Sequence, residues 1–445
     1  MNTRMQTRNW MAMAIALGIL LITPGCANAA QAQLNVAMGQ PTLPADKKQV
    51  TYLKVGLTGF SIENGAQRTP VNVALVLDRS GSMQGEKLRG AKDAAIRALD
   101  RLGPNDIVSV VVFDHTVNVL VPATKLTDKA AVQAAIERIE AGGSTALFAG
   151  VSKGAEEVRK FIDRNRVNRV ILLTDGLANV GPSSPGELGA LGASLKKEGI
   201  AVTTLGLGLD YGEDLLSQLA GKSDGNHAFI KTAADLTRVF NYEFGDVLTV
   251  VAQEVSVKIQ CADGIRPVRV LGREAEINGQ AVYAQLNQLY SQQEKFIMLE
   301  VEIPAASEGQ SREVATVSVS YANMATRTTD KLSSTVSVSF SKSAEAVQKD
   351  ENKNVMVDAI STVANDNNKQ AMLLRDQGKI EEARAQFMFN GNFLQGNAAK
   401  YQSEKLNASC INNFSDAKNV EPGKWESRRK ETVQSQYGID FQSKQ

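Results

Sequence analysis

Val73-Ala74-Leu75-Val76-Leu77 is followed directly by Asp78-Arg79-Ser80-Gly81-Ser82, so an apolar run ends on three oxygen-bearing side chains at alternate positions. The run has the aliphatic, β-branched composition of a strand buried in a parallel sheet. Open α/β sheets bind their ligands at the carboxyl ends of such strands. Asp78, Ser80 and Ser82 are hard oxygen donors, which suit Mg²⁺, Ca²⁺ or Mn²⁺ better than zinc.

An alternation of strand and helix continues from Thr69 to Asp246. Between the apolar runs, apolar residues recur at helical spacing, as in Leu88, Ala91 and Ala95. This alternation predicts a doubly wound α/β domain over residues 69–246, with a largely parallel sheet and helices on both faces. The other apolar runs are Ile107–Phe113, Val170–Leu173 and Ala201–Leu207.

The hydrophobic period changes to two after Val247. Val255, Val257 and Ile259 alternate with polar residues, and similar strands follow to residue 342. Alternating strands separated by turn residues predict an antiparallel β-sandwich over residues 247–342. The strand-like stretch 50–57 cannot fold alone, so we expect the N-terminal segment 31–68 to add a strand to this sandwich. The α/β domain would then be an insertion in the sandwich.

The composition turns polar and helical from residue 343. Residues 343–411 predict a helical hairpin that packs on the sandwich, with its turn at Asp376-Gln377-Gly378-Lys379. Residues 412–445 are expected to form a weakly ordered tail.

The first thirty residues resemble a secretory signal peptide. Arg4 and Arg8 precede a short apolar core, and Ala27-Asn28-Ala29 fits a cleavage site. We therefore expect export to the periplasm or cell envelope. Cys26 follows the apolar core, so a lipid anchor at Cys26 and simple cleavage near Ala29 are both open, and lipidation would be the only link to a membrane.

Composition narrows the classes of partner. The 445 residues are 43% hydrophobic and 22% charged, which is typical of globular domains. A formal net charge of +1 gives no electrostatic reason to expect nucleic acid or an anionic membrane as the main partner. Beyond Cys26, Cys261 and Cys410 could pair in an oxidising compartment or stay as two buried thiols.

Two further motifs belong with the opening turn. Gly142-Gly143-Ser144-Thr145 presents a hydroxyl on a glycine-rich turn before a helix, and Thr174-Asp175-Gly176 ends the apolar run 170–173 with a carboxylate. With these three motifs in order, the segment from about residue 71 to 245 resembles a von Willebrand factor type A domain with a complete metal-ion-dependent adhesion site. The arrangement of the whole chain resembles bacterial proteins related to the inter-α-trypsin inhibitor heavy chains.

This resemblance implies a ligand set and a function. The ion would be Mg²⁺, or Ca²⁺ or Mn²⁺ in its place, and an acidic group from an unknown protein partner would complete its coordination. The chain would thus be an exported binding or adhesion module and not an enzyme. The metal ligands implied by the resemblance are Asp78, Ser80, Ser82, Thr145 and Asp175.

Two other functions fit the same residues. The protein could be an envelope scaffold whose ion is purely structural. It could also be a hydrolase in which the metal activates water, and this would need a general base near the ion. Asp114 and His115 leave a strand of the same sheet, yet neither His115 nor His227 belongs to a triad or a zinc-ligand pattern. Both histidines are expected to be ordinary surface or loop residues.

Overall fold

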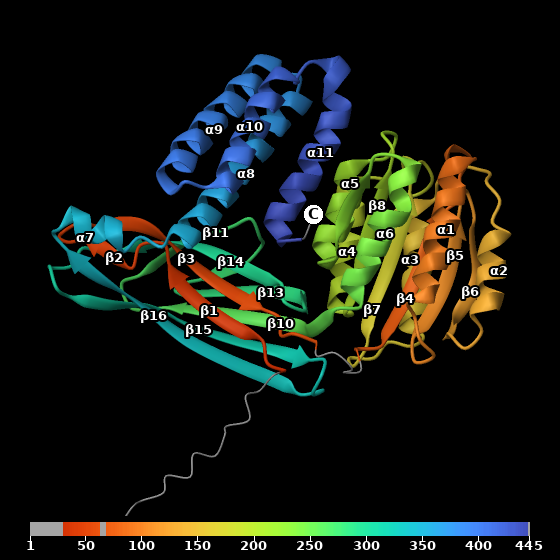
Figure 1. The fold of residues 1–445 in the computed structure, drawn as a ribbon, viewed down its shortest axis with the longest axis horizontal. Helices are drawn as coiled ribbons and strands as arrows, with labels where there is room; N and C mark the ends of the chain where they lie inside the picture. The colour runs from red at the N-terminus through yellow and green to blue at the C-terminus, as the bar shows by residue number, and fades with distance from the viewer. Residues whose placement is uncertain (1–29, 63–67, 444–445) are drawn as a thin grey trace, which may run out of the picture.

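The computed structural model describes residues 30–62 and 68–443. Figure 1 shows an α/β domain beside a β-sandwich, with the C-terminal helices standing above the sandwich. Nearly all of the predicted leader, Cys26 included, lies outside the described residues. Among the described helices, none combines the length and the apolar content needed to cross a bilayer.

The α/β domain is built on one six-stranded sheet. Its strands are β4 (Val71–Asp78), β5 (Ile107–Phe113), β6 (Val117–Lys125), β7 (Val167–Thr174), β8 (Ile200–Leu207) and β9 (His227–Ile230), and their spatial order is β6-β5-β4-β7-β8-β9. Every residue of β4, β5, β7 and β8 is buried, which explains their continuous apolar sequences. The edge strand β6 runs antiparallel to β5, whereas the other neighbouring pairs are parallel.

Six helices cover the two faces of this sheet (Figure 1). They are α1 (Glu86–Asp100), α2 (Lys129–Glu137), α3 (Leu147–Arg159), α4 (Pro185–Lys197), α5 (Glu213–Ser223) and α6 (Ala233–Val247). Leu75 and Leu77 of β4 pack in one core with α1, α2 and α6, while Val76 packs in a second core with α3, α4 and α5. The strand therefore buries both faces, and its carboxyl end is held rigidly between two helical layers.

The sandwich has a four-stranded and a six-stranded sheet. The first has the order β1-β3-β14-β11 and the second β12-β13-β10-β15-β16-β2. The strands are β1 (Gln33–Met38), β2 (Thr42–Pro44), β3 (Gln49–Thr58), β10 (Val250–Cys261), β11 (Arg266–Leu271), β12 (Glu276–Asn278), β13 (Ala281–Tyr290), β14 (Glu294–Ile303), β15 (Ser311–Asn323) and β16 (Thr329–Ser341). Pairing is antiparallel except between β16 and β2.

Strand β3 shows that the α/β domain is an insertion. It pairs with β14 from Gln49 opposite Ile303 to Thr58 opposite Glu294, and the α/β domain follows β3 in the chain before β10 resumes the sandwich. Leu53 of β3 shares a core with Val257 of the other sheet. The predicted fold class is confirmed, although the N-terminal segment supplies three strands where one was expected.

Up to residue 443, where the described part of the chain ends, five helices follow the sandwich: α7 (Ala344–Lys349), α8 (Lys353–Asp376), α9 (Ile380–Tyr401), α10 (Glu404–Lys418) and α11 (Pro422–Phe441). The turn between α8 and α9 lies where the sequence predicts it. Val355 and Ala359 of α8 pack against Phe296 and Met298, so this hairpin rests on the sandwich.

The prediction of a weakly ordered tail after residue 412 is wrong. Helix α10 continues to Lys418, and α11 buries Trp425, Val433 and Tyr437. The three apolar residues do not form a continuous amphipathic stripe, so the pattern that normally predicts a helix is weak here. The ordering of α11 instead depends on contacts with distant parts of the chain.

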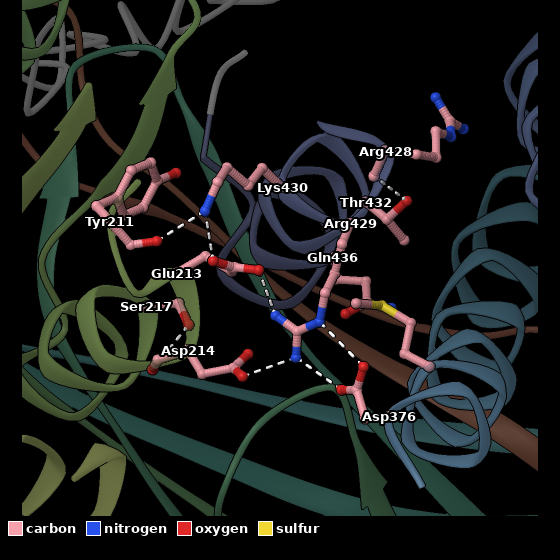
Figure 2. Close-up of polar contacts among 11 residues, drawn as sticks. Tyr211, Glu213, Asp214, Ser217, Asp376, Arg428, Arg429, Lys430, Thr432 and Gln436 are labelled. Atoms are coloured by element: carbon pink, nitrogen blue, oxygen red, sulfur yellow. Dashed lines mark hydrogen bonds and ion pairs between the residues drawn. The ribbon is translucent and has the colours of Figure 1, made fainter. Parts of the chain in front are cut away.

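Figure 2 shows how α11 is fixed between α5 and α8. The Arg429 guanidinium forms ion pairs with Glu213 and Asp214 in the first turn of α5 and with Asp376 at the end of α8. The buried Lys430 ammonium donates to Glu213 at 2.6 Å. Glu213 and Asp214 lie more than 200 residues before α11 in the sequence, so a local sequence pattern could not reveal these contacts.

The structure answers whether the two later cysteines pair and where the two histidines lie. Cys261 and Cys410 are both buried and free, so the open question of a disulfide is answered by two separate thiols. His115 is exposed as expected. His227 is not a loop residue but a buried member of β9, with its Nδ1 2.9 Å from the Thr204 hydroxyl, because β9 is covered by α11.

Candidate metal centre

The five residues of the predicted site come from three loops at one edge of the α/β sheet. Asp78 is the last residue of β4, and Asp175 directly follows the neighbouring parallel strand β7. Ser80 and Ser82 lie on the turn after β4, which forms a 3₁₀ turn at Gly81–Met83. Thr145 lies two residues before α3. The parallel order of the strands therefore brings together side chains up to 97 residues apart in the sequence.

Hydrogen bonds connect the loop after β4 with the loop after β7. Asp78 accepts from the Ser80 backbone N–H at 2.7 Å and from the Thr174 hydroxyl. The hydroxyls of Ser80 and Ser82 are 3.1 Å apart, and Ser82 donates to Asp175 Oδ1 at 2.7 Å. The carboxylates and both serine hydroxyls thus form one continuous polar cluster.

Thr145 joins this cluster beside Gly176. A Cβ atom added to Gly176 would lie 3.2 Å from Thr145 Oγ1 and 3.5 Å from Ser82 Oγ, so any side chain there would crowd the space between the two hydroxyls. Backbone bonds hold the loops in place, since Gly81 N–H donates to the Gly143 carbonyl at 3.0 Å. A glycine at position 176 keeps a polar cradle open between three loops.

The cradle suits a hard divalent cation. Asp78 and Asp175 are fully buried at 0% exposure, and two carboxylates buried this closely call for a nearby positive charge. Burial raises the pKa of Asp78 to about 6, and the charge of Asp175 adds to this effect, while the hydrogen bonds from Thr174 and Ser80 oppose it. Carboxylate and hydroxyl oxygens are ligands that Mg²⁺, Ca²⁺ and Mn²⁺ accept. The residues present therefore fit such an ion.

One charged neighbour of the site is not indicated by any sequence motif. Lys87, in the first turn of α1, forms an ion pair with Asp175 Oδ2. Its ammonium is also 4.0 Å from Asp210, on the loop between β8 and α5. The only local signal is its position five residues after Ser82, at the start of a helix that points toward the same edge of the sheet.

Asp114 and His115 lie near the cradle, and the Asp114 carboxylate is already engaged by other groups. Asp114 Oδ1 accepts from both the N–H and the hydroxyl of Thr116, and Arg79 lies 2.8 Å from Asp114 Oδ2. Burial opposes ionisation of Asp114, but the bonds from Thr116 and the charge of Arg79 outweigh it and lower its pKa. Asp114 is thus a stabilised carboxylate that is already engaged.

The surface around the cradle is partly apolar. Leu177 and Val180, on the loop after β7, are 61% and 37% exposed, and Leu209, on the loop after β8, is 39% exposed. The two loops lie close together, since a Cβ added to Gly212 would be 3.6 Å from the Leu177 side chain. We call Leu177, Val180 and Leu209 the apolar rim.

Comparison with known proteins identifies the family of the α/β domain. Residues 72–241 match the model of the von Willebrand factor type A domain. An uncharacterized protein of Synechocystis sp. is 29% identical over 278 residues, which cover 60% of this chain and 65% of that protein. Inter-alpha-trypsin inhibitor heavy chain H3 of Pongo abelii is 35% identical over 135 residues, covering 28% of this chain and 15% of the heavy chain.

A solved structure matches nearly the whole fold. The von Willebrand factor type A protein from Catenulispora acidiphila superimposes with a TM-score of 0.67 at 16% identity, covering 85% of this chain and 90% of that chain. At this identity the likeness concerns the fold alone. The matched regions span less than two thirds of either curated relative above.

Proposed function

Because residues 72–241 form a von Willebrand factor type A domain, we propose that this protein is an exported binding module that holds a divalent cation and captures a carboxylate of a protein partner. The proposal is carried by one observation, the convergence of two buried carboxylates and three hydroxyls around the Gly176 cradle. A metal-bound carboxylate is a strong and directional contact, so one acidic residue of a partner could anchor the complex.

The ion would be held by the ligand set that the family resemblance implies. When bound, it would supply a Lewis-acidic position that accepts an external carboxylate oxygen. Asp78 and Ser80 fix the geometry on the first loop, since the Ser80 N–H orients Asp78 at 2.7 Å. Two carboxylates against a doubly charged ion, with Lys87 bound to one of them, leave room for a further negative ligand. The residues that would hold the ion are Asp78, Ser80, Ser82, Thr145 and Asp175.

The apolar rim narrows the chemistry of the partner. Leu177 is 61% exposed two residues after the ligand Asp175, and Val180 is near Thr145 because its N–H donates to the Thr145 carbonyl at 3.3 Å. Burial of such side chains on binding contributes roughly 25 cal/mol per Å² of apolar area. We therefore propose a partner that presents an aspartate or glutamate flanked by apolar residues.

The location of the partner follows from the leader-like first thirty residues. Their charged start, apolar core and small-residue end support export, and Cys26 supplies either a lipid anchor or a residue removed with the leader. We propose that capture takes place in the periplasm or the cell envelope.

Capture from an envelope extract tests the proposal. The immobilised protein would be compared in Mg²⁺ and in excess chelator, and wild type would be compared with Asp78→Asn. Asp163→Asn is the matched control, because Asp163 is an exposed carboxylate in the loop that precedes the opposite end of β7. We expect capture by wild type and by Asp163→Asn in Mg²⁺, and loss of capture with chelator or Asp78→Asn.

The same experiment separates the two other functions. Equal capture with and without chelator, together with a chelator-induced fall in melting temperature, would support a scaffold with a structural ion and overturn our proposal. Metal-dependent turnover of a panel of esters and phosphoesters that is lost in Asp78→Asn would instead support a hydrolase.

A further inference from the structure

Lys87 lies beside the cradle but is not one of the proposed metal ligands. Its ammonium forms an ion pair with Asp175 Oδ2, while the other oxygen of Asp175 accepts from the Ser82 hydroxyl at 2.7 Å. One carboxylate oxygen of Asp175 therefore faces the serine hydroxyls, while the other is paired with the Lys87 ammonium. The lysine side chain is 30% exposed, whereas Asp175 is fully buried.

The charges around the cradle can be counted from the contacts. Asp78 and Asp175 contribute two negative charges, and Lys87 contributes one positive charge. Arg79 is paired with Asp114, so that pair adds no net charge. Asp210, 4.0 Å from Lys87, is 76% exposed and screened by solvent. The cradle thus offers a net charge close to −1 to an entering cation.

We propose that Lys87 sets the charge of this centre, weakening its affinity for the divalent ion in order to keep the bound ion attractive to an external carboxylate. With a doubly charged ion in place, the count of two carboxylates and one lysine leaves about one positive charge. Without Lys87 the same site would be close to neutral. The inference rests on the proposed function and assigns Lys87 a positioning and tuning role, since Lys87 acts through Asp175.

This role differs from that of an ordinary stabilising ion pair. A pair that only joins α1 to the loop after β7 would lower stability when broken and leave metal affinity the same or weaker. Removal of a lysine that competes electrostatically with the ion would instead raise the affinity for the metal, because it frees Asp175 Oδ2 and removes a like charge.

The test is Mg²⁺ binding to Lys87→Met by titration calorimetry, repeated with Mn²⁺. Methionine keeps the length and the apolar stem of the side chain and removes the charge. We expect Lys87→Met to bind Mg²⁺ about tenfold tighter than wild type or more, as one removed unit charge at short range implies. Lys87→Arg, which keeps the charge, should bind within about twofold of wild type. Lys92→Met is the matched control on the same helix, because Lys92 contacts the Glu137 carbonyl away from the cradle.

Thermal unfolding is the second readout. Without metal, Lys87→Met should melt below wild type, because Asp175 loses its counter-ion in a fully buried position. Saturating Mg²⁺ should raise its melting temperature by more than it raises that of wild type. A variant that folds only in Mg²⁺ would support the inference. Equal or weaker Mg²⁺ affinity, or failure to fold even in saturating Mg²⁺, would overturn it.

Partner capture completes the test and separates the two proposals. At saturating Mg²⁺, the Lys87→Met protein should retain less of the envelope partner than wild type. If wild type binds Mg²⁺ but captures nothing, the proposed function fails while the affinity comparison still decides the role of Lys87. If wild type captures a partner and Lys87→Met has unchanged affinity for Mg²⁺, the role of Lys87 fails and the function stands.

Discussion

The Ser82 hydroxyl donates a hydrogen bond to Asp175 Oδ1 at 2.7 Å, and this contact ties the loop after β4 to the loop after β7 across 93 residues of sequence. A hydroxyl in this position serves as donor to a carboxylate when no cation is near and offers its lone pairs when a cation is bound. The pair therefore marks the place where the two loops would share an ion.

Replacement of Ser82 by alanine tests that role. Ser82→Ala removes one oxygen ligand from an exposed position, so we expect an intact fold and Mg²⁺ affinity lowered by roughly tenfold, in line with the loss of one charge-assisted contact. Titration calorimetry and the Mg²⁺-induced rise in melting temperature measure the change. Ser183→Ala, an exposed serine on the loop before α4, is the control. Unchanged affinity in Ser82→Ala would remove Ser82 from the ligand set.

The apolar rim gives a prediction about the partner. Leu177→Ser removes an apolar side chain that is 61% exposed and adds no charge near the carboxylates of the cradle. We expect Mg²⁺ affinity within about twofold of wild type and partner capture reduced at least about tenfold, because burial of a leucine contributes on the order of 1.5–3 kcal/mol. Calorimetry and capture are measured on the same sample. Full capture by Leu177→Ser would mean that the partner does not cover the rim.

Glu243 makes stability depend on pH. This carboxyl in α6 is buried and accepts from Asn226 Nδ2 at 2.8 Å. Burial, helped by the negative charge of Asp246, raises the pKa of Glu243 to about 7. The hydrogen bond from Asn226 and the positive charge of Arg169 act in the opposite direction. The folded state thus holds this proton more tightly than the unfolded chain, whose pKa is near 4.5. The stability contributed by Glu243 is present below pH 4.5 and is lost as pH rises to about 7.

Glu243→Gln should remove that loss. We expect the free energy of unfolding at pH 8 to exceed that of wild type by roughly 2–3 kcal/mol, with the difference vanishing near pH 4.5. Urea unfolding at pH 4.5, 6 and 8 measures it, with Glu276→Gln on the exposed strand β12 as the control. A difference that does not change with pH would show that Glu243 does not titrate in this range.

The packing of α11 against α5 depends on the positively charged side chains of Arg429 and Lys430. Lys430 is buried, and its ammonium lies 4.2 Å from the centroid of the Tyr211 ring and 2.7 Å from the Tyr211 carbonyl oxygen (Figure 2). Lys430→Met leaves the Glu213 carboxylate without this partner, and we expect a loss of about 3 kcal/mol, as for broken buried ion pairs. Chemical denaturation measures the loss, and hydrogen exchange should show faster exchange in α11. Lys424→Met, at an exposed position of the same helix, should change neither.

The two buried cysteines should be inert in the folded protein. Burial raises the pKa of Cys261 to about 11 and also raises that of Cys410, so little thiolate forms at neutral pH. We expect both to be alkylated slowly under native conditions and rapidly in guanidinium, as measured by peptide-resolved mass spectrometry. A crosslinked peptide containing both residues would contradict the separate thiols of the structure.

The sequence allowed prediction of most of the α/β domain because its information is local. The run Val73–Leu77 is apolar throughout, since β4 is buried on both faces, and the motif around Asp78 follows it directly. Strand β6 has no clear sequence signal, because it lies at the edge of the sheet with about half of its residues exposed and contains Pro122. Helix α11 is not predictable from its own sequence, because ion pairs to the distant helix α5 hold it in place.

The same distinction applies to the candidate site. The sequence by itself determined which oxygen donors end the strands and turns, and the rule that parallel strands share a carboxyl edge brought Asp78 and Asp175 together. Only the tertiary structure decided that Gly176 leaves space between Thr145 and Ser82, and that Lys87 is bound to Asp175. The physical reason is that a strand end and its motif are set by neighbours along the chain, whereas a charge is balanced by whatever group the packing of separate loops brings within a few ångströms.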